Sequence, residues 1–105
     1  MHDGIVLLVA ASSTKEAEGI AKTLVEERLV ACVNILPPMH SLFHWKGELC
    51  RENEVLLVLK SRQRVLKKIV RRVKELHSYE VPEIIALPVI GGSEDYITWI
   101  QESIS

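Results

Sequence analysis

The residues with the most chemical potential in this 105-residue chain lie in one short stretch, His77-Ser78-Tyr79-Glu80-Val81-Pro82-Glu83. It combines an imidazole, a phenol and two carboxylates, which are groups that transfer protons or bind metal ions. The stretch joins a predicted helix to a predicted strand, and connections on a rigid fold often carry its function. We therefore take His77 as a candidate metal ligand and this stretch as the candidate site.

A structural role for the same residues is the favoured alternative. His77 follows a helix, so we expect its ring to bond a local carboxylate or carbonyl, while metal binding and proton transfer stay open. Glu80 and Glu83 are too few for a dedicated calcium site, and Lys60 at a strand end is a candidate partner for Glu83. Tyr79 is expected to pack with its hydroxyl bonded.

The other potential ligands are weaker. His40 and His44 lie on a predicted strand, where four residues span ~13 Å, so they cannot chelate one ion unless the segment coils. In a trimer each histidine could still meet its symmetry mates. Cys32 is expected to be a small buried hydrophobe, and Cys50 an exposed thiol able to bind Cu(I). Neither cysteine has CxxC spacing, which argues against a zinc knuckle or a redox pair.

A basic helix is the best argument for nucleic acid, with seven positive residues between Arg62 and Lys74. However, the net charge is −1, only 5% of residues are aromatic, and no glycine-rich phosphate loop accompanies the helix. We therefore expect a solvated helix face and no nucleic-acid partner. The sequence shows no nucleophile paired with a base, so we expect no enzyme activity.

Hydrophobic periodicity predicts the order β-α-β-β-α-β followed by one more helix. The predicted strands are the apolar runs 5–11, 29–36, 55–59 and 84–90, with a further strand-like segment at 41–45. Ser13 and Glu16 predict a capping box at the start of the first helix, which ends near Glu27-Arg28. The second helix covers 63–76, and Ser93 caps the last. A turn is expected at Lys46-Gly47-Glu48 or at Glu52-Asn53-Glu54.

This order is typical of an α+β, ferredoxin-like βαββαβ sandwich, here with an extra C-terminal helix in a single domain, 1–105. Right-handed crossovers place the first and third strands in the centre and the second and fourth outside. Pro37, Pro38 and Pro88 fall on the predicted outer strands, where proline is tolerated. Residues 30–60 read as a long hairpin that can extend beyond one subunit. Such long strands and open edges favour pairing in a closed ring of subunits.

The cellular context is read from absences in the sequence. His2-Asp3 gives no basic start to a signal peptide, and no apolar run approaches ~20 residues. We therefore expect a cytoplasmic protein with no membrane association.

Several motifs occur in the right order for one family: Ala31-Cys32-Val33-Asn34-Ile35, the run 41–45, Lys46-Gly47, Leu59-Lys60, the His77–Glu83 stretch and Tyr96 with Trp99. Together they resemble the CutA (CutA1) divalent-cation-tolerance family. The resemblance implies a PII-like homotrimer, with strands paired across subunits and polar residues in the clefts between them. It also implies a role in divalent-cation tolerance, with weak binding of copper or another divalent metal ion and no required cofactor.

This sequence departs from the resemblance at points that bear on copper. Some bacterial members have a histidine just before the site histidine and a cysteine in the first strand, and both are proposed copper ligands. Here Leu76 and the apolar residues around Val9 occupy those places, which weakens copper binding at His77. Ser78 replaces the usual proline, and Phe43 replaces the usual tyrosine.

A second function of a different class stays open. A PII-like sensor trimer would bind a small ligand in the cleft between subunits. The candidate ligand-binding residues for it are Trp45, Lys60, Tyr79 and Glu83.

Overall fold

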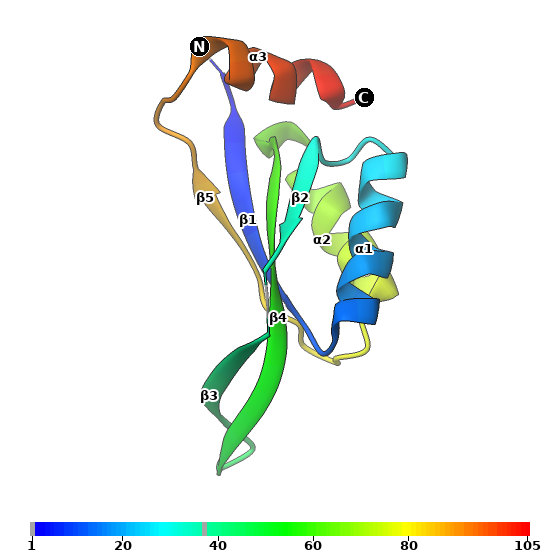
Figure 1. The fold of residues 1–105 in the computed structure, drawn as a ribbon, viewed down its shortest axis with the longest axis vertical. Coiled ribbons are helices and arrows are strands. Elements are labelled where there is room, and N and C mark those ends of the chain that lie inside the picture. Colours follow the sequence, from blue (N-terminus) through cyan, green and yellow to red (C-terminus); the bar gives the residue numbers. More distant parts are fainter. Residues whose placement is uncertain (1, 37) are drawn as a thin grey trace.

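One antiparallel sheet with helices packed on it forms the fold, in a computed structural model that describes residues 2–36 and 38–105 (Figure 1). The strands are β1 (Gly4–Ala11), β2 (Cys32–Ile35), β3 (Met39–Trp45), β4 (Glu48–Arg62) and β5 (Ile84–Pro88). The helices are α1 (Thr14–Glu26), the 3₁₀ turn η1 (Gln63–Val65), α2 (Leu66–Leu76) and α3 (Glu94–Ser103).

The strand order confirms the predicted ferredoxin-like topology. The order β2-β4-β1-β5 puts β1 and β4 in the centre and the other two outside. β1 pairs with β4 along its whole length, from Gly4 opposite Arg62 to Ala11 opposite Val55. Pro88, as predicted, lies on an outer strand, while Pro37, also predicted on an outer strand, falls outside the described residues.

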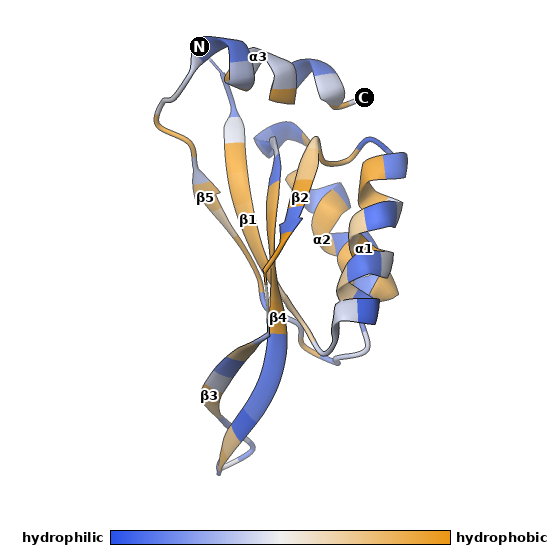
Figure 2. Cartoon of the chain, in the orientation of Figure 1, coloured by the Kyte–Doolittle hydropathy of each residue, from blue (hydrophilic) through white to orange (hydrophobic). Residues whose placement is uncertain are grey.

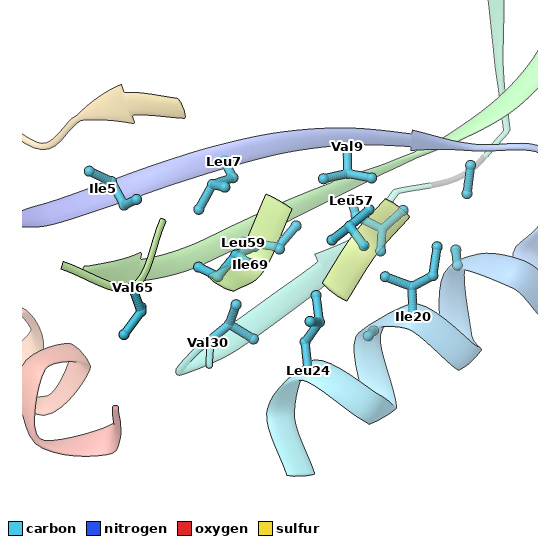
Figure 3. Close-up of a cluster of buried hydrophobic side chains, with 14 of the residues drawn as sticks. Ile5, Leu7, Val9, Ile20, Leu24, Val30, Leu57, Leu59, Val65 and Ile69 are labelled. Carbon is cyan, nitrogen blue, oxygen red and sulfur yellow. The ribbon is translucent and has the colours of Figure 1, made fainter. Parts of the chain in front are cut away.

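The core lies between the sheet and two helices, because α1 and α2 cover the same face (Figure 1). Odd-numbered residues of β1 and β4 point into it, following the two-residue period of a strand. Figure 3 shows Leu7, Leu57 and Leu59 facing Leu24 of α1 and Ile69 of α2, all fully buried. The predicted burial of the first strand on both faces is therefore wrong for this subunit, since Val6 and Leu8 are only half-buried.

The opposite face of the sheet, which we call the open face, is apolar and uncovered. Ile85 and Leu87 of β5 are 52% and 49% exposed there. Leu56 and Val58 of β4 lie on the same face, because Leu8 of β1 pairs with Val58 on one side and with Ile85 on the other, and both are half-buried. An apolar face of this kind on an ordinary single subunit usually marks an interaction surface.

A long hairpin carries β3 and half of β4 away from the helices (Figure 1). It gives the subunit its elongated shape, with extents of 44 × 25 × 24 Å. Lys46 and Gly47 form its two-residue turn with φ angles of 52° and 81°, as a type I′ hairpin turn requires. The alternative turn at Glu52-Asn53-Glu54 is wrong, because β4 continues through these residues and pairs with β3.

Figure 2 shows that β4 changes character along its length, hydrophilic in the hairpin and hydrophobic in the sheet. The bounds of the predicted strands also change, whereas the second helix keeps its predicted bounds of 63–76. The second strand begins at Cys32 rather than residue 29, because Leu29 and Val30 close the connection from α1. The second helix begins with the 3₁₀ turn η1, whose backbone N–H at Arg64 bonds the Asp3 carboxylate.

Replacing Gly47 by alanine should destabilise the protein by about 1 kcal/mol, because its φ of +81° disfavours a side chain. Gly19 is the matched control, since it lies exposed within α1 and an added Cβ there meets no atom within 4 Å. Gly19→Ala should stabilise the protein by about 0.5–1 kcal/mol. Urea denaturation measures both changes, and equal effects of the two substitutions would contradict this account of the turn.

Candidate functional site

The candidate stretch forms a joint where three segments meet. His77 is the C-terminal cap of α2, and its backbone N–H bonds the Val73 carbonyl at 2.9 Å. The residues from Ser78 to Glu83 then lead into β5. Beside them lie the end of β1 and the first turn of α1, which reach the joint through Ala10 and Glu16. The side chain of His77 is fully buried there.

Both ring nitrogens of His77 are engaged within the subunit. Nε2 lies 2.7 Å from the Ala10 carbonyl oxygen, and Nδ1 lies 3.0 Å from the backbone nitrogen of Tyr79. A carbonyl can only accept and a backbone N–H can only donate, so Nε2 carries the proton and Nδ1 accepts. The ring is therefore neutral and has no free lone pair for a metal ion in this arrangement. The predicted carbonyl contact is confirmed.

Glu16 holds the joint together with one carboxylate. Oε1 accepts from the backbone N–H and the hydroxyl of Ser12 at 2.8 and 2.9 Å, and Oε2 accepts from the backbone N–H of Ser78 at 2.8 Å. Half of the predicted capping box is confirmed, because the Ser13 hydroxyl accepts from the Glu16 N–H at 3.1 Å. The other half is wrong, because the carboxylate binds Ser12 and Ser78 and not the Ser13 N–H.

These contacts also set the charge state of Glu16. Burial alone would raise its pKa, but the hydrogen bonds from Ser12 and Ser78 outweigh burial and lower the pKa from 4.5 to about 2. Glu16 Oε1 lies 4.0 Å from His77 Nδ1. The carboxylate thus stays charged at neutral pH while it serves as a structural acceptor.

Tyr79 lies against His77, with ring centroids 4.8 Å apart. Burial, and after it the nearby Glu54 carboxylate, raises the pKa of Tyr79 to about 12. The phenol is therefore protonated at neutral pH and unsuited to acid–base catalysis there. Glu54 itself is only 6% exposed on β4. Sequence reasoning missed it, because Glu54 ends the polar run Glu52-Asn53-Glu54, which indicated a possible turn rather than a buried residue.

The four predicted ligand-binding residues do not come together in one subunit. Trp45 lies at the hairpin tip, six residues along the strand pair from the level of Glu54 and Tyr79, or ~20 Å. Lys60 lies opposite Val6 in the sheet, while Glu83 precedes Ile84, which pairs with Val9. The expected Lys60–Glu83 ion pair is therefore absent from this subunit. A shared cleft stays a prediction that needs neighbouring subunits.

Lys60 instead belongs to a small polar cluster on the open face. Its ammonium group donates to the side-chain oxygen of Asn34, and Cys32 is its cross-strand neighbour. Burial, and after it the nearby Cys32 thiol, raises the pKa of Tyr96. The Tyr96 ring packs on Trp99 with centroids 5.5 Å apart, and both rings are nearly half exposed.

The arrangement of metal-binding residues is sparse. Within residues 2–36 and 38–105, no three His, Cys, Asp or Glu residues gather closely enough to hold a metal ion. His40 and His44 both lie exposed on β3. Cys50 is half-buried on β4 rather than freely exposed. The joint around His77 therefore has the geometry of a sealed structural contact, and the open face carries the accessible polar groups.

Fold and site together define a small split-βαβ subunit with an uncovered sheet face. The family model of the CutA1 divalent ion tolerance protein matches residues 5–103. The chain is 46% identical to the divalent-cation tolerance protein CutA of Thermus thermophilus, covering 93% of this chain and 95% of that protein. The solved structure of a divalent cation tolerance protein, Cut A1, from Thermus thermophilus superposes with a TM-score of 0.95 at 44% identity, covering 97% and 99% of the two chains.

The chain belongs to the CutA1 divalent ion tolerance family. Its relatives carry names from different compartments. A chloroplastic CutA of Arabidopsis thaliana is 39% identical over 94% of this chain, which spans 54% of that protein. The structure of a periplasmic CutA from Archaeoglobus fulgidus matches with a TM-score of 0.94 at 36% identity, covering 97% and 99% of the chains. Among the described residues, none of the helices has the length and apolar character needed to span a bilayer.

The stability contributed by Glu16 should depend on pH. Its folded pKa of about 2 lies below the usual 4.5, so this contribution is present above pH 4.5 and is lost as the pH falls toward 2. Glu16→Gln should cost about 1–2 kcal/mol at pH 7, less than the full shift implies because water still reaches the carboxylate. The difference between the variant and the wild type should vanish near pH 2 in urea denaturation. A difference that is constant from pH 7 to pH 2 would contradict the assignment.

His77→Ala should destabilise the protein by about 1–3 kcal/mol, because it leaves the Ala10 carbonyl and the Tyr79 N–H without their buried partner. His44→Ala is the matched control, since His44 is exposed on β3, and it should change stability by less than about 0.5 kcal/mol. Thermal and urea denaturation of both variants measure the difference. Equal effects would show that the His77 contacts add nothing to the fold.

Proposed function

We propose that this protein acts in divalent-cation tolerance as a cytoplasmic homotrimer that binds copper or another divalent cation weakly. The proposal is carried by one observation, the match of the CutA1 divalent ion tolerance family over residues 5–103. We further propose that it is not an enzyme and requires no cofactor. In support, His77 and Glu16 are the residues of the joint whose side chains could act as an acid or a base, and both already form hydrogen bonds with the backbone.

The trimer is proposed because a single subunit leaves apolar surface exposed to water and a strand edge unpaired. The open face exposes Ile85 and Leu87 to water, and the free edge of β5 leaves backbone groups without strand partners. The hairpin of β3 and β4 adds exposed apolar residues, including Leu42 at 59% and Leu49 at 56%. Burying such surfaces is worth about 25 cal/mol per Å², and a closed ring covers all of them without leaving an edge.

Weak metal binding is proposed because a strong site would need ligands that one subunit, in its described residues, does not gather. His77 becomes a ligand only if Nδ1 releases the Tyr79 N–H or Nε2 releases the Ala10 carbonyl. Each release costs about 1–3 kcal/mol, and that cost lowers the affinity for a metal ion directly. Ligands from a second subunit would be needed to complete the coordination.

A second candidate, the PII-like sensor, is favoured by the polar cluster around Lys60. This cluster places the Lys60 ammonium group, the Asn34 amide and the Tyr96 phenol on the open face. The Tyr96 ring also packs on Trp99. Such a combination suits a small anionic ligand bound between subunits. The four residues first predicted for this role would then share it with residues of α3.

Sedimentation and calorimetry test the two functions together. We expect a trimer at micromolar concentration, with Cu(II) or Zn(II) binding that is weaker in His77→Ala than in the control His44→Ala. A monomer would overturn the assembly, and unchanged copper affinity in His77→Ala would overturn the metal assignment at this residue. Binding of nucleotides without any metal binding would favour the sensor.

A further inference from the structure

Lys60 is a cation on an apolar surface without a carboxylate partner. Among the described residues it forms no ion pair, whereas Arg62, two residues along β4 on the same face, pairs with Asp3 at 2.7 Å. The neighbours of Lys60 across the sheet are Val6 on one side and Cys32 on the other. The oxygen of Asn34, which is neutral, is the one acceptor for its ammonium group in the hydrogen bonds of the described residues.

This placement conflicts with the proposed assembly unless an anion is added. If the open face is buried between subunits, the ammonium group of Lys60 is buried with it and loses its hydration. Burying an unpaired charge costs several kcal/mol, which an adjacent amide oxygen does not offset. A lysine can also respond by losing its proton, but a neutral amine would forfeit the charge-assisted bond to Asn34. An anion beside Lys60 resolves the conflict at lower cost.

We propose that Lys60 and Asn34 form an oxyanion site on the open face, filled in the assembled protein by a carboxylate or a phosphate. The chemistry supports an acceptor of this kind. Lys60 retains N–H donors beyond the one that Asn34 accepts, and the Asn34 NH₂ group is free to donate because its oxygen binds Lys60. The argument that Lys60 needs an anion depends on the proposed assembly. The hydrogen-bond donors of the site do not, because one subunit supplies them all.

Two sources outside the subunit can provide the oxyanion, a second copy of the chain or a small anion from solution. Glu83 of the same subunit is excluded by the strand register. Val6 pairs with Lys60 on one side and with Leu87 on the other, and Glu83 precedes Leu87 by four residues, or ~13 Å along the strand. A carboxylate must therefore come from another copy, where Glu83 is a candidate, or from solution. The half-exposed Tyr96 ring lies near Cys32, the cross-strand neighbour of Lys60, and packs on Trp99.

The test compares Lys60→Met with Lys22→Met, a control that removes an exposed lysine from α1. Sedimentation first establishes the assembly of the wild type, which tests the proposed function separately. Melting temperatures are then measured against inorganic phosphate and acetate, with chloride holding the ionic strength constant. A free oxyanion should raise the melting temperature of the wild type and of Lys22→Met saturably, but not that of Lys60→Met. Asn34→Asp should also remove the response, because it supplies a carboxylate within the subunit.

A carboxylate from a neighbouring subunit predicts a different pattern. The wild type should then ignore added anions, and Lys60→Met should dissociate about tenfold or more readily than Lys22→Met. Glu83→Gln should add little further dissociation to Lys60→Met if Glu83 is the partner. Equal behaviour of Lys60→Met and Lys22→Met in both assays overturns the site. If the wild type is a monomer, the assembly fails, and the phosphate and acetate titration of that monomer alone decides whether the site exists.

Discussion

The one-sided cover of the sheet is the constraint on which the rest of this structure depends. Two helices bury the odd-numbered residues of β1 and of β4 from Val55 onward, while on the opposite face Val6, Leu8, Leu56 and Val58 are only half-buried in the described part of the subunit. The open face is largely apolar on β1, on β5 and on the middle of β4, so the sheet has two hydrophobic faces and one helical layer. The predicted burial of the first strand on both sides is therefore met on one side only within the subunit, and burial of the other side would require the assembly that we propose.

The joint at His77 is a consequence of this architecture. The second crossover must bring the chain from α2 back to β5 past the end of β1, and its polar backbone groups need partners there. Glu16 and His77 supply them, one from the first turn of α1 and one from the cap of α2. A stretch dense in chemical groups thus serves to close a crossover. Because the His77 ring and the Glu16 carboxylate form these hydrogen bonds, a ligand would have to displace a partner to bind them.

Much of the fold followed from the sequence because its signals are local. Hydrophobic period, the Ser13 and Ser93 caps and the Lys46-Gly47 turn each depend on neighbours along the chain, and each was confirmed. The errors at the candidate site concern contacts between distant segments. The Glu16 carboxylate reaches Ser78, 62 residues away, and no spacing rule could choose it over the nearby Ser13 N–H. The site residues Trp45, Lys60, Tyr79 and Glu83 were grouped by family resemblance, and one subunit spreads them along its length.

The polar regions around His77 and around Lys60 differ in whether their hydrogen-bond and charge partners lie within the chain. Around His77 both ring nitrogens and the Glu16 carboxylate have partners within the chain, so the region is complete as it folds. Around Lys60 the partners are neutral and the aromatic rings are half exposed, so the region is incomplete as it folds. A methionine has a stem of similar length and would cover the same apolar surface without a charge to balance. A lysine at this position, beside an Arg62 that pairs with Asp3, is the feature that the proposed oxyanion would explain.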